Sequence, residues 1–174
     1  MKFLNVFGKI TDYATRVFAY VAAAALVFNV VIVLLNVILR AFGSSVIGVE
    51  EYISMAEVVL IFLGLGYVQY NKGLVHVCFF MKKIPGKIGP MISWALCHWV
   101  SVAVIAVLAW QTLERIPLAK QATTSLLIPY RPFYVVIFIG CILYGLAQLY
   151  EALKATIALF NSEVREQVMA ELPA

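Results

Sequence analysis

Charge is what this 174-residue chain has least of: 13% of its residues are charged, whereas 64% are hydrophobic. Soluble domains average about 25% charged and about 45–50% apolar residues. Both departures indicate a membrane protein. Four long apolar segments occupy most of the sequence, so they leave no room for an appended soluble domain with a catalytic or ligand-capturing function of its own.

Cysteine and histidine are scarce as well. The three cysteines, Cys78, Cys97 and Cys141, fit neither a Cys-x-x-Cys redox pair nor the spacing of a zinc site. A haem or a metal ion needs converging ligands, but His76 is expected beyond the second apolar segment and His98 inside the third. We therefore expect no cofactor, no catalytic residue and no enzymatic activity. For His98 we expect a hydrogen bond inside a helix bundle.

The apolar segments predict an all-α integral membrane protein with four transmembrane helices, which form a single membrane domain over residues 1–174. The predicted spans are residues 17–39, 52–70, 88–113 and 133–150. As a helix the first span covers about 34 Å, enough for a hydrocarbon core of about 30 Å. It is too long for the core of a secretory signal, so we expect an uncleaved anchor, with Thr11 and Asp12 available to cap it.

Lysine and arginine are unevenly divided between the two sides of the predicted bundle. If both termini are cytoplasmic, nine of the 13 basic residues fall on the inner side and four on the outer side. Cytoplasmic loops carry the excess of positive charge in membrane proteins, so both termini are predicted to be cytoplasmic. The same residues account for the net charge of +4, and no nucleic-acid partner is inferred from it.

Three carboxylates, Glu50, Glu51 and Glu57, lead into the second span. We expect Ser44 and Ser45 to cap a short amphipathic helix that lies at the interface and leads through the first two carboxylates. An unpaired charge in hydrocarbon costs at least about 2.5 kcal/mol, so all three need headgroups, water or a protein partner. The three carboxylates therefore have two alternative roles, contact with a partner protein or simple anchoring at the lipid headgroups.

Polar and small residues inside the spans mark candidate helix contacts. Asn29 and Asn36 lie seven residues apart on one helix face, where they bond either another helix of this chain or a second subunit. Gly64 and Gly66 allow close helix packing, and Tyr67 lies where an aromatic belt is expected. The candidates for partner contact or interfacial anchoring are Glu50, Glu51, Glu57, Asn29, Asn36, Tyr67 and His76.

Independent transport is poorly supported by this sequence. Secondary transporters usually contain repeats and broken helices that build a site at the membrane midplane. No internal repeat is visible here, and no span carries a charge near its centre. We therefore expect a small bundle in the lipid bilayer whose polar groups are satisfied by a partner.

Two stretches stand out, GVEEYISMAEVVLIFLGLGYVQYNKGLVHV from Gly48 and TTSLLIPYRPFYVVIFIG from Thr123. With the four-span layout they resemble the small membrane subunit (DctQ type) of tripartite ATP-independent periplasmic (TRAP) transporters, over nearly the whole chain. The residues that carry the resemblance are Glu50, Glu51, Tyr52, Phe62, Leu63, Gly64, Tyr67, Gln69, His76, Val77, Leu127, Ile128, Pro129, Pro132, Tyr134 and Gly140. Arg131, where an aromatic residue is expected, and the apolar run 78–80 depart from the family pattern.

The resemblance implies partners and a function that the spacing of residues in this sequence does not reveal. Such a subunit pairs, in the bacterial inner membrane, with a larger membrane subunit that holds the substrate and sodium sites. A periplasmic binding protein delivers an organic anion such as a C4-dicarboxylate or sialic acid. The resemblance also implies that this multi-pass chain is a non-catalytic scaffold for the larger subunit. The alternative from another class is a freestanding membrane redox or enzyme subunit.

Overall fold

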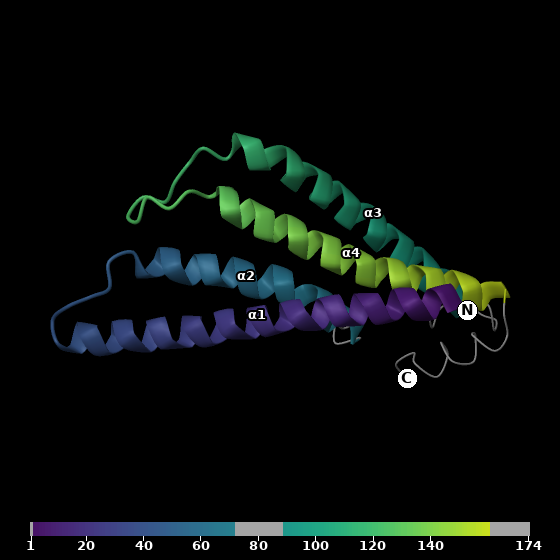
Figure 1. Cartoon of the computed structure of the whole chain (residues 1–174), viewed down its shortest axis with the longest axis horizontal. Coiled ribbons are helices and arrows are strands. Elements are labelled where there is room, and N and C mark those ends of the chain that lie inside the picture. Colours follow the sequence, from purple (N-terminus) through teal and green to yellow (C-terminus); the bar gives the residue numbers. More distant parts are fainter. Residues whose placement is uncertain (1, 72–88, 161–174) are drawn as a thin grey trace.

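The computed structural model describes residues 2–71 and 89–160, which form four helices (Figure 1). In chain order these are α1 (Lys2–Ala41), α2 (Val49–Tyr70), α3 (Gly89–Leu118) and α4 (Arg131–Phe160). All four are long and apolar enough to cross a membrane. The predicted all-helical architecture with four long apolar helices is therefore confirmed. In the described ranges the only extended pairing is an isolated bridge between Ala122 and Pro129.

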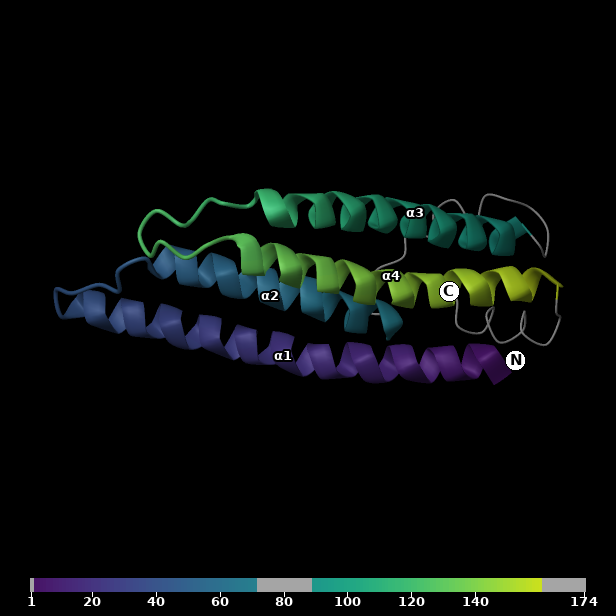
Figure 2. The same cartoon turned by 45° about the horizontal axis from the view of Figure 1, so that its top comes forward.

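The helices lie side by side in the order α1, α2, α4, α3 (Figures 1 and 2). α2 packs against α1 and α4, and α3 packs against α4, while α1 meets α4 along its first half. We call the end of the bundle near the N-terminus the proximal end. The end that holds the connections 42–48 and 119–130 is the distal end. In Figure 1 the helices converge toward the proximal end and spread apart toward the distal end.

Each predicted span lies within one of these helices, apart from residue 88, which is outside the described residues. The helices extend past the spans, and the prolines in these flanks, Pro117 and Pro132, lie close to a helix end. Pro117, near the end of α3, lies beyond the third predicted span. The apolar segments therefore locate the helices, whereas their polar flanks decide where each helix begins and ends.

The expected cap of the first span is wrong. α1 already begins at Lys2, so Thr11 and Asp12 lie in its interior. The Thr11 hydroxyl donates a hydrogen bond to the carbonyl of Phe7, at 3.0 Å, and Asp12 forms a 2.9 Å ion pair with Arg16 one turn later. Both side chains therefore bond along a continuous helix, because no proline interrupts this part of the chain.

The short interfacial helix expected before the second span is not a separate element. Residues 42–48 form turns and unstructured chain, in which Gly43 and Gly48 have left-handed φ values of 80° and 69°. Glu50 and Glu51 belong to the first turn of α2. Nothing between the Gly48 turn and the middle of α2 breaks a helix, so the carboxylates and the span form one element.

Glycine brings the backbones of α2 and α4 close together. A Cβ at Gly140 of α4 would lie 2.5 Å from the carbonyl oxygen of Phe62 on α2. A Cβ at Gly66 of α2 would lie 3.1 Å from the Cβ of Leu143 on α4. Small residues permit such an approach in membrane bundles. Close packing is thus confirmed for Gly66, whereas Gly64 faces α1 at an ordinary contact distance of 3.5 Å.

The buried apolar core is small. Ala22, Leu63 and Leu143 bring α1, α2 and α4 together in one cluster. Ala22 is the single buried residue between residues 17 and 41, so nearly all apolar side chains of that stretch point outward. An outward apolar surface of this extent suits a bundle surrounded by lipid or by another membrane protein.

Candidate functional site

At the distal end, Glu51 ties α2 to the connection between α3 and α4. Its carboxylate oxygens accept hydrogen bonds from the backbone N–H groups of Ser125, at 2.7 Å, and Leu126, at 2.9 Å. Gly48 packs beside the same turn, since a Cβ there would lie 2.8 Å from the Cγ of Leu126. Hydrogen bonds to an ionised acceptor are about twice as strong as neutral ones. We call the contact of Glu51 with Ser125 and Leu126 the distal clasp.

The connection held by this clasp is a compact turn built on Thr123, which is buried. The Thr123 N–H donates to the carbonyl of Ile128 at 3.0 Å, and the Thr123 hydroxyl accepts from the Ile128 N–H at 3.0 Å. Leu127 has a φ of 54°, a left-handed conformation that is uncommon for a residue with a side chain. The surrounding hydrogen bonds hold this conformation, so the turn and the clasp stabilise each other.

The other two predicted carboxylates make no such contact. Glu50 and Glu57 are exposed, and neither side chain has a hydrogen-bond partner within residues 2–71 and 89–160. Glu50 lines, together with Glu51 and Ser54, a cavity of about 370 Å³ beside the distal turn. The structure therefore separates the three: Glu51 bonds inside the chain, while Glu50 and Glu57 face outward.

The two asparagines also have different surroundings. The Oδ1 of Asn36 accepts a hydrogen bond from the N–H of Val46 at 3.2 Å, so Asn36 bonds the connection 42–48 of its own chain. The Oδ1 of Asn29 is buried and has no hydrogen-bond partner in the described part of the chain. A buried polar atom without a partner costs free energy. Within the described residues, the Oδ1 of Asn29 therefore makes no bond to another helix of this chain.

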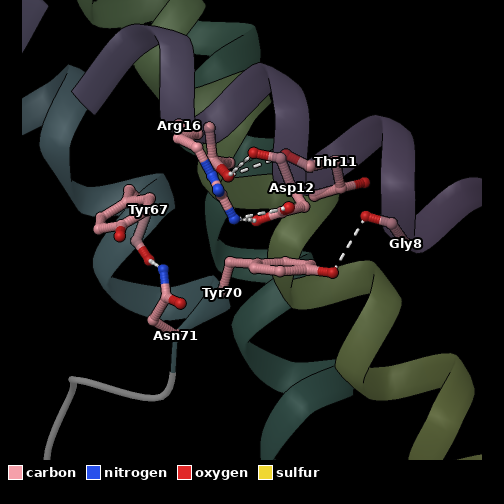
Figure 3. A network of polar contacts seen from close by, with 8 residues as sticks. Gly8, Thr11, Asp12, Arg16, Tyr67, Tyr70 and Asn71 are labelled. Atoms are coloured by element: carbon pink, nitrogen blue, oxygen red, sulfur yellow. Dashed lines mark hydrogen bonds and ion pairs between the residues drawn. The ribbon is translucent and has the colours of Figure 1, made fainter. Parts of the chain in front are cut away.

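At the proximal end, the last turns of α2 are joined to α1 (Figure 3). The Tyr67 carbonyl accepts hydrogen bonds from the backbone N–H of Asn71, at 3.0 Å, and from its side-chain Nδ2, at 2.9 Å. The Tyr70 hydroxyl donates to the carbonyl of Gly8 on α1, at 3.0 Å. Tyr67 thus lies in the last turn of α2. His76 lies outside the described residues.

A buried polar chain joins α3 to α4. The Nδ1 of His98 and the Oε1 of Gln148 lie 2.6 Å apart, and the Nε2 of Gln148 donates to the Tyr144 hydroxyl at 2.7 Å. The Trp94 ring packs edge-on against His98, with ring centroids 4.7 Å apart. The expected hydrogen bond of His98 inside the bundle is confirmed. No signal in the sequence pairs His98 with Gln148, which lies 50 residues later.

Gln69 is a buried amide that the candidate residues from the sequence did not include. It is 1% exposed, and neither its Nε2 nor its Oε1 has a hydrogen-bond partner among the described residues. Thr11 and Thr15 are similarly buried, but each hydroxyl bonds a carbonyl of its own helix. The only signal for Gln69 was its place in the first motif of the family resemblance.

These groups support a structural role more than a chemical one. In residues 2–71 and 89–160, no three His, Cys, Asp or Glu side chains are placed to hold a metal ion together. Several of the polar contacts described above join one helix to another or to a connection, among them those of Glu51, Tyr70 and His98. What the chain offers to other molecules is its outward apolar surface, together with Glu50, Glu57 and Asn29. The candidate functional site is therefore a set of binding surfaces.

Comparison with known proteins gives one finding. A family model described as "Tripartite ATP-independent periplasmic transporters, DctQ component" matches residues 29–157, from the middle of α1 to the end of α4. The matched range covers more than half of the chain and includes both motifs of the resemblance. It ends within the last turn of α4. No curated protein and no solved structure matches the chain.

Proposed function

Since the chain belongs to the DctQ family, the small membrane component of tripartite ATP-independent periplasmic transporters, we propose that it is the non-catalytic scaffold of a sodium-coupled importer. Membership makes it a multi-pass transporter subunit and implies an inner-membrane location, a large membrane subunit and a periplasmic binding protein as partners. The proposed cargo is an organic anion of the sialic acid or C4-dicarboxylate type. In this proposal both termini are cytoplasmic, so the distal end faces the periplasm.

The observation that supports the scaffold role is the rigid connection between the two halves of the chain. Backbone contact between Gly140 and Phe62 joins α2 to α4 inside the bundle, and the distal clasp of Glu51 joins α2 to the turn before α4. Segments that move are usually those with few buried contacts. A body linked both in its interior and at its distal end suits the fixed part of a transporter.

The surface of α1 supports contact with a large apolar partner. Its second half buries only Ala22 within the chain, and its apolar side chains point outward. The Oδ1 of Asn29 lies in the same half, buried and without a partner among the described residues. An amide at a helix–helix contact in a membrane commonly bonds across the two helices. We propose that Asn29 bonds the large subunit through its Nδ2, since its Oδ1 is covered by this chain. We propose further that Glu50 and Glu57 contact the partner or lipid headgroups.

The alternative, a freestanding membrane redox or enzyme subunit, is favoured by no feature of residues 2–71 and 89–160. A cofactor would give the purified chain an absorption band in the visible range or a bound metal. A transporter subunit needs neither an absorption band nor a bound metal.

Reconstituted uptake tests the proposed function. The large membrane subunit is placed in proteoliposomes with or without this chain, and the binding protein is added with labelled sialic acid or C4-dicarboxylate. We expect uptake of one of these anions to need both subunits, the binding protein and an inward sodium gradient. Without the chain, uptake should fall at least tenfold, because the large subunit loses its fixed support.

An equal potassium gradient is the control for ion coupling. Uptake that is unchanged when this chain is omitted would contradict the scaffold role. Uptake that needs the chain but follows either gradient equally would contradict sodium coupling and leave the subunit role intact. The two parts of the proposal are therefore tested separately.

A further inference from the structure

A polar hollow of about 550 Å³ lies at the distal end, between the last turns of α3 and the start of α4. We call it the headgroup hollow. Its polar lining consists of Gln111, Glu114, Arg115, Gln121, Tyr130 and Tyr134. Tyrosines of this kind favour the interface between hydrocarbon and water. The hollow is therefore placed at the depth of lipid headgroups.

The hollow contains one positive and one negative side chain, and both retain hydrogen-bonding capacity for a ligand. Arg115 is exposed, and its guanidinium group has no ion pair or hydrogen bond with any residue of the described ranges. The Oε1 of Glu114 accepts a 2.8 Å hydrogen bond from the indole Nε1 of Trp110, and its second oxygen has no partner in the same ranges. Successive residues Glu114 and Arg115 thus present opposite charges to one ligand.

An apolar hollow adjoins this polar one. It has a volume of about 480 Å³, is lined by Ala106, Val107 and Trp110, and shares Gln111 and Glu114 with the headgroup hollow. It follows α3 toward the middle of the span. From Arg115 to Ala106 the helix rises about 14 Å, which is close to the depth of one leaflet of the hydrocarbon core. A polar hollow that continues into an apolar one has the shape of a site for a lipid.

We propose that the two hollows bind a phospholipid with an ammonium headgroup, of the phosphatidylethanolamine class. Arg115 pairs with the phosphate, because a guanidinium matches phosphate geometry with two donors. The free oxygen of Glu114 accepts from the ammonium group, which offers three donors. One acyl chain lies along Ala106, Val107 and Trp110. This proposal is independent of the transporter role.

A membrane helix from a partner is a poorer occupant of the same place. It would cover Arg115 and Glu114 with apolar side chains, and a covered charge without a counter-charge is costly. A zwitterionic lipid brings both counter-charges and an apolar tail in one molecule. Glu114 and Arg115 are adjacent in α3, and the ammonium and the phosphate are likewise neighbours in the ligand.

Native mass spectrometry of the full chain tests the proposal. The chain is purified in mild detergent, stripped of lipid, and titrated with dioleoyl phosphatidylethanolamine or dioleoyl phosphatidylglycerol. We expect Arg115→Gln to weaken binding of both lipids about tenfold or more, because both contain phosphate. Glu114→Gln should weaken binding of the ethanolamine lipid and spare the glycerol lipid, which has no ammonium group.

Arg131→Gln is the matched control, because Arg131 is an exposed cation at the same end and does not line either hollow. Equal binding by wild type and Arg115→Gln, or an equal loss in Arg131→Gln, would overturn the proposal. So would equally tight binding of glycerophosphoethanolamine, which lacks acyl chains. A photo-crosslinker at Val107 that attaches to the large subunit in the intact complex, and not to lipid, would assign the hollow to a partner helix.

Discussion

Gly140→Ala is expected to loosen the bundle more than alanine at any other described glycine of the four helices. The added Cβ would lie 2.5 Å from the carbonyl oxygen and 2.6 Å from the Cβ of Phe62, so α2 and α4 would have to move apart. The neighbouring atom is backbone and cannot rotate away. Overpacking of this kind costs about 1–3 kcal/mol of unfolding free energy, and we expect the upper part of that range.

Gly145→Ala is the matched control on the same helix. A Cβ there would meet the Cγ2 of Ile105 on α3 at 3.5 Å, an ordinary contact, so no loss of stability is expected. The temperature at which half of the purified protein leaves the monodisperse size-exclusion peak measures the effect in one detergent. Equal temperatures for Gly140→Ala and Gly145→Ala would show that α2 and α4 are not packed through Gly140.

Glu51→Gln is expected to free the turn before α4. The glutamine side chain loses the charge that strengthens both backbone contacts, and its amide group can accept through one oxygen only. Ser125 and Leu126 would then lose one of their acceptors, and Leu127 would lose the support that holds its left-handed backbone. We expect the turn to open about ten times more often.

Limited digestion with chymotrypsin measures this opening, because Leu126 and Leu127 are sites for cleavage inside the turn. Proteolysis of a briefly opened segment follows the population of the open form. Glu50→Gln is the control, since Glu50 is the neighbouring carboxylate and its side chain has no hydrogen-bond partner in residues 2–71 and 89–160. A cleavage rate in Glu51→Gln no higher than in Glu50→Gln would contradict the clasp.

The architecture could be predicted largely from the sequence because each helix contains an uninterrupted apolar run. The helix ends could not, because they depend on polar residues that are compatible with either helix or turn. Thr11 and Asp12 fit a cap, yet they lie within α1. Ser44, Ser45 and Glu50 fit a separate interfacial helix, yet the only helix there is α2, which begins at Val49, directly after the left-handed Gly48.

The contacts of the candidate residues were harder to predict than their presence. Glu51 is a candidate because it is a charge at the start of a span. Its partner Ser125, however, is 74 residues away and contributes only a backbone N–H. Every residue has such a group, so no side-chain pattern marks the pair. His98 was expected to bond inside the bundle, whereas the choice of Gln148 depends on how α3 and α4 are rotated against each other.

Affinity purification of the tagged chain in mild detergent, with mass spectrometry of the proteins that accompany it, tests the central claim most directly. We expect a stoichiometric and very hydrophobic partner with many membrane spans, which is the large transporter subunit, because the family match assigns this chain to a transporter complex. The partner's own sequence would then identify the class of anion. A stable monomer or homo-oligomer that purifies without such a partner would contradict the account of this chain as a scaffold subunit.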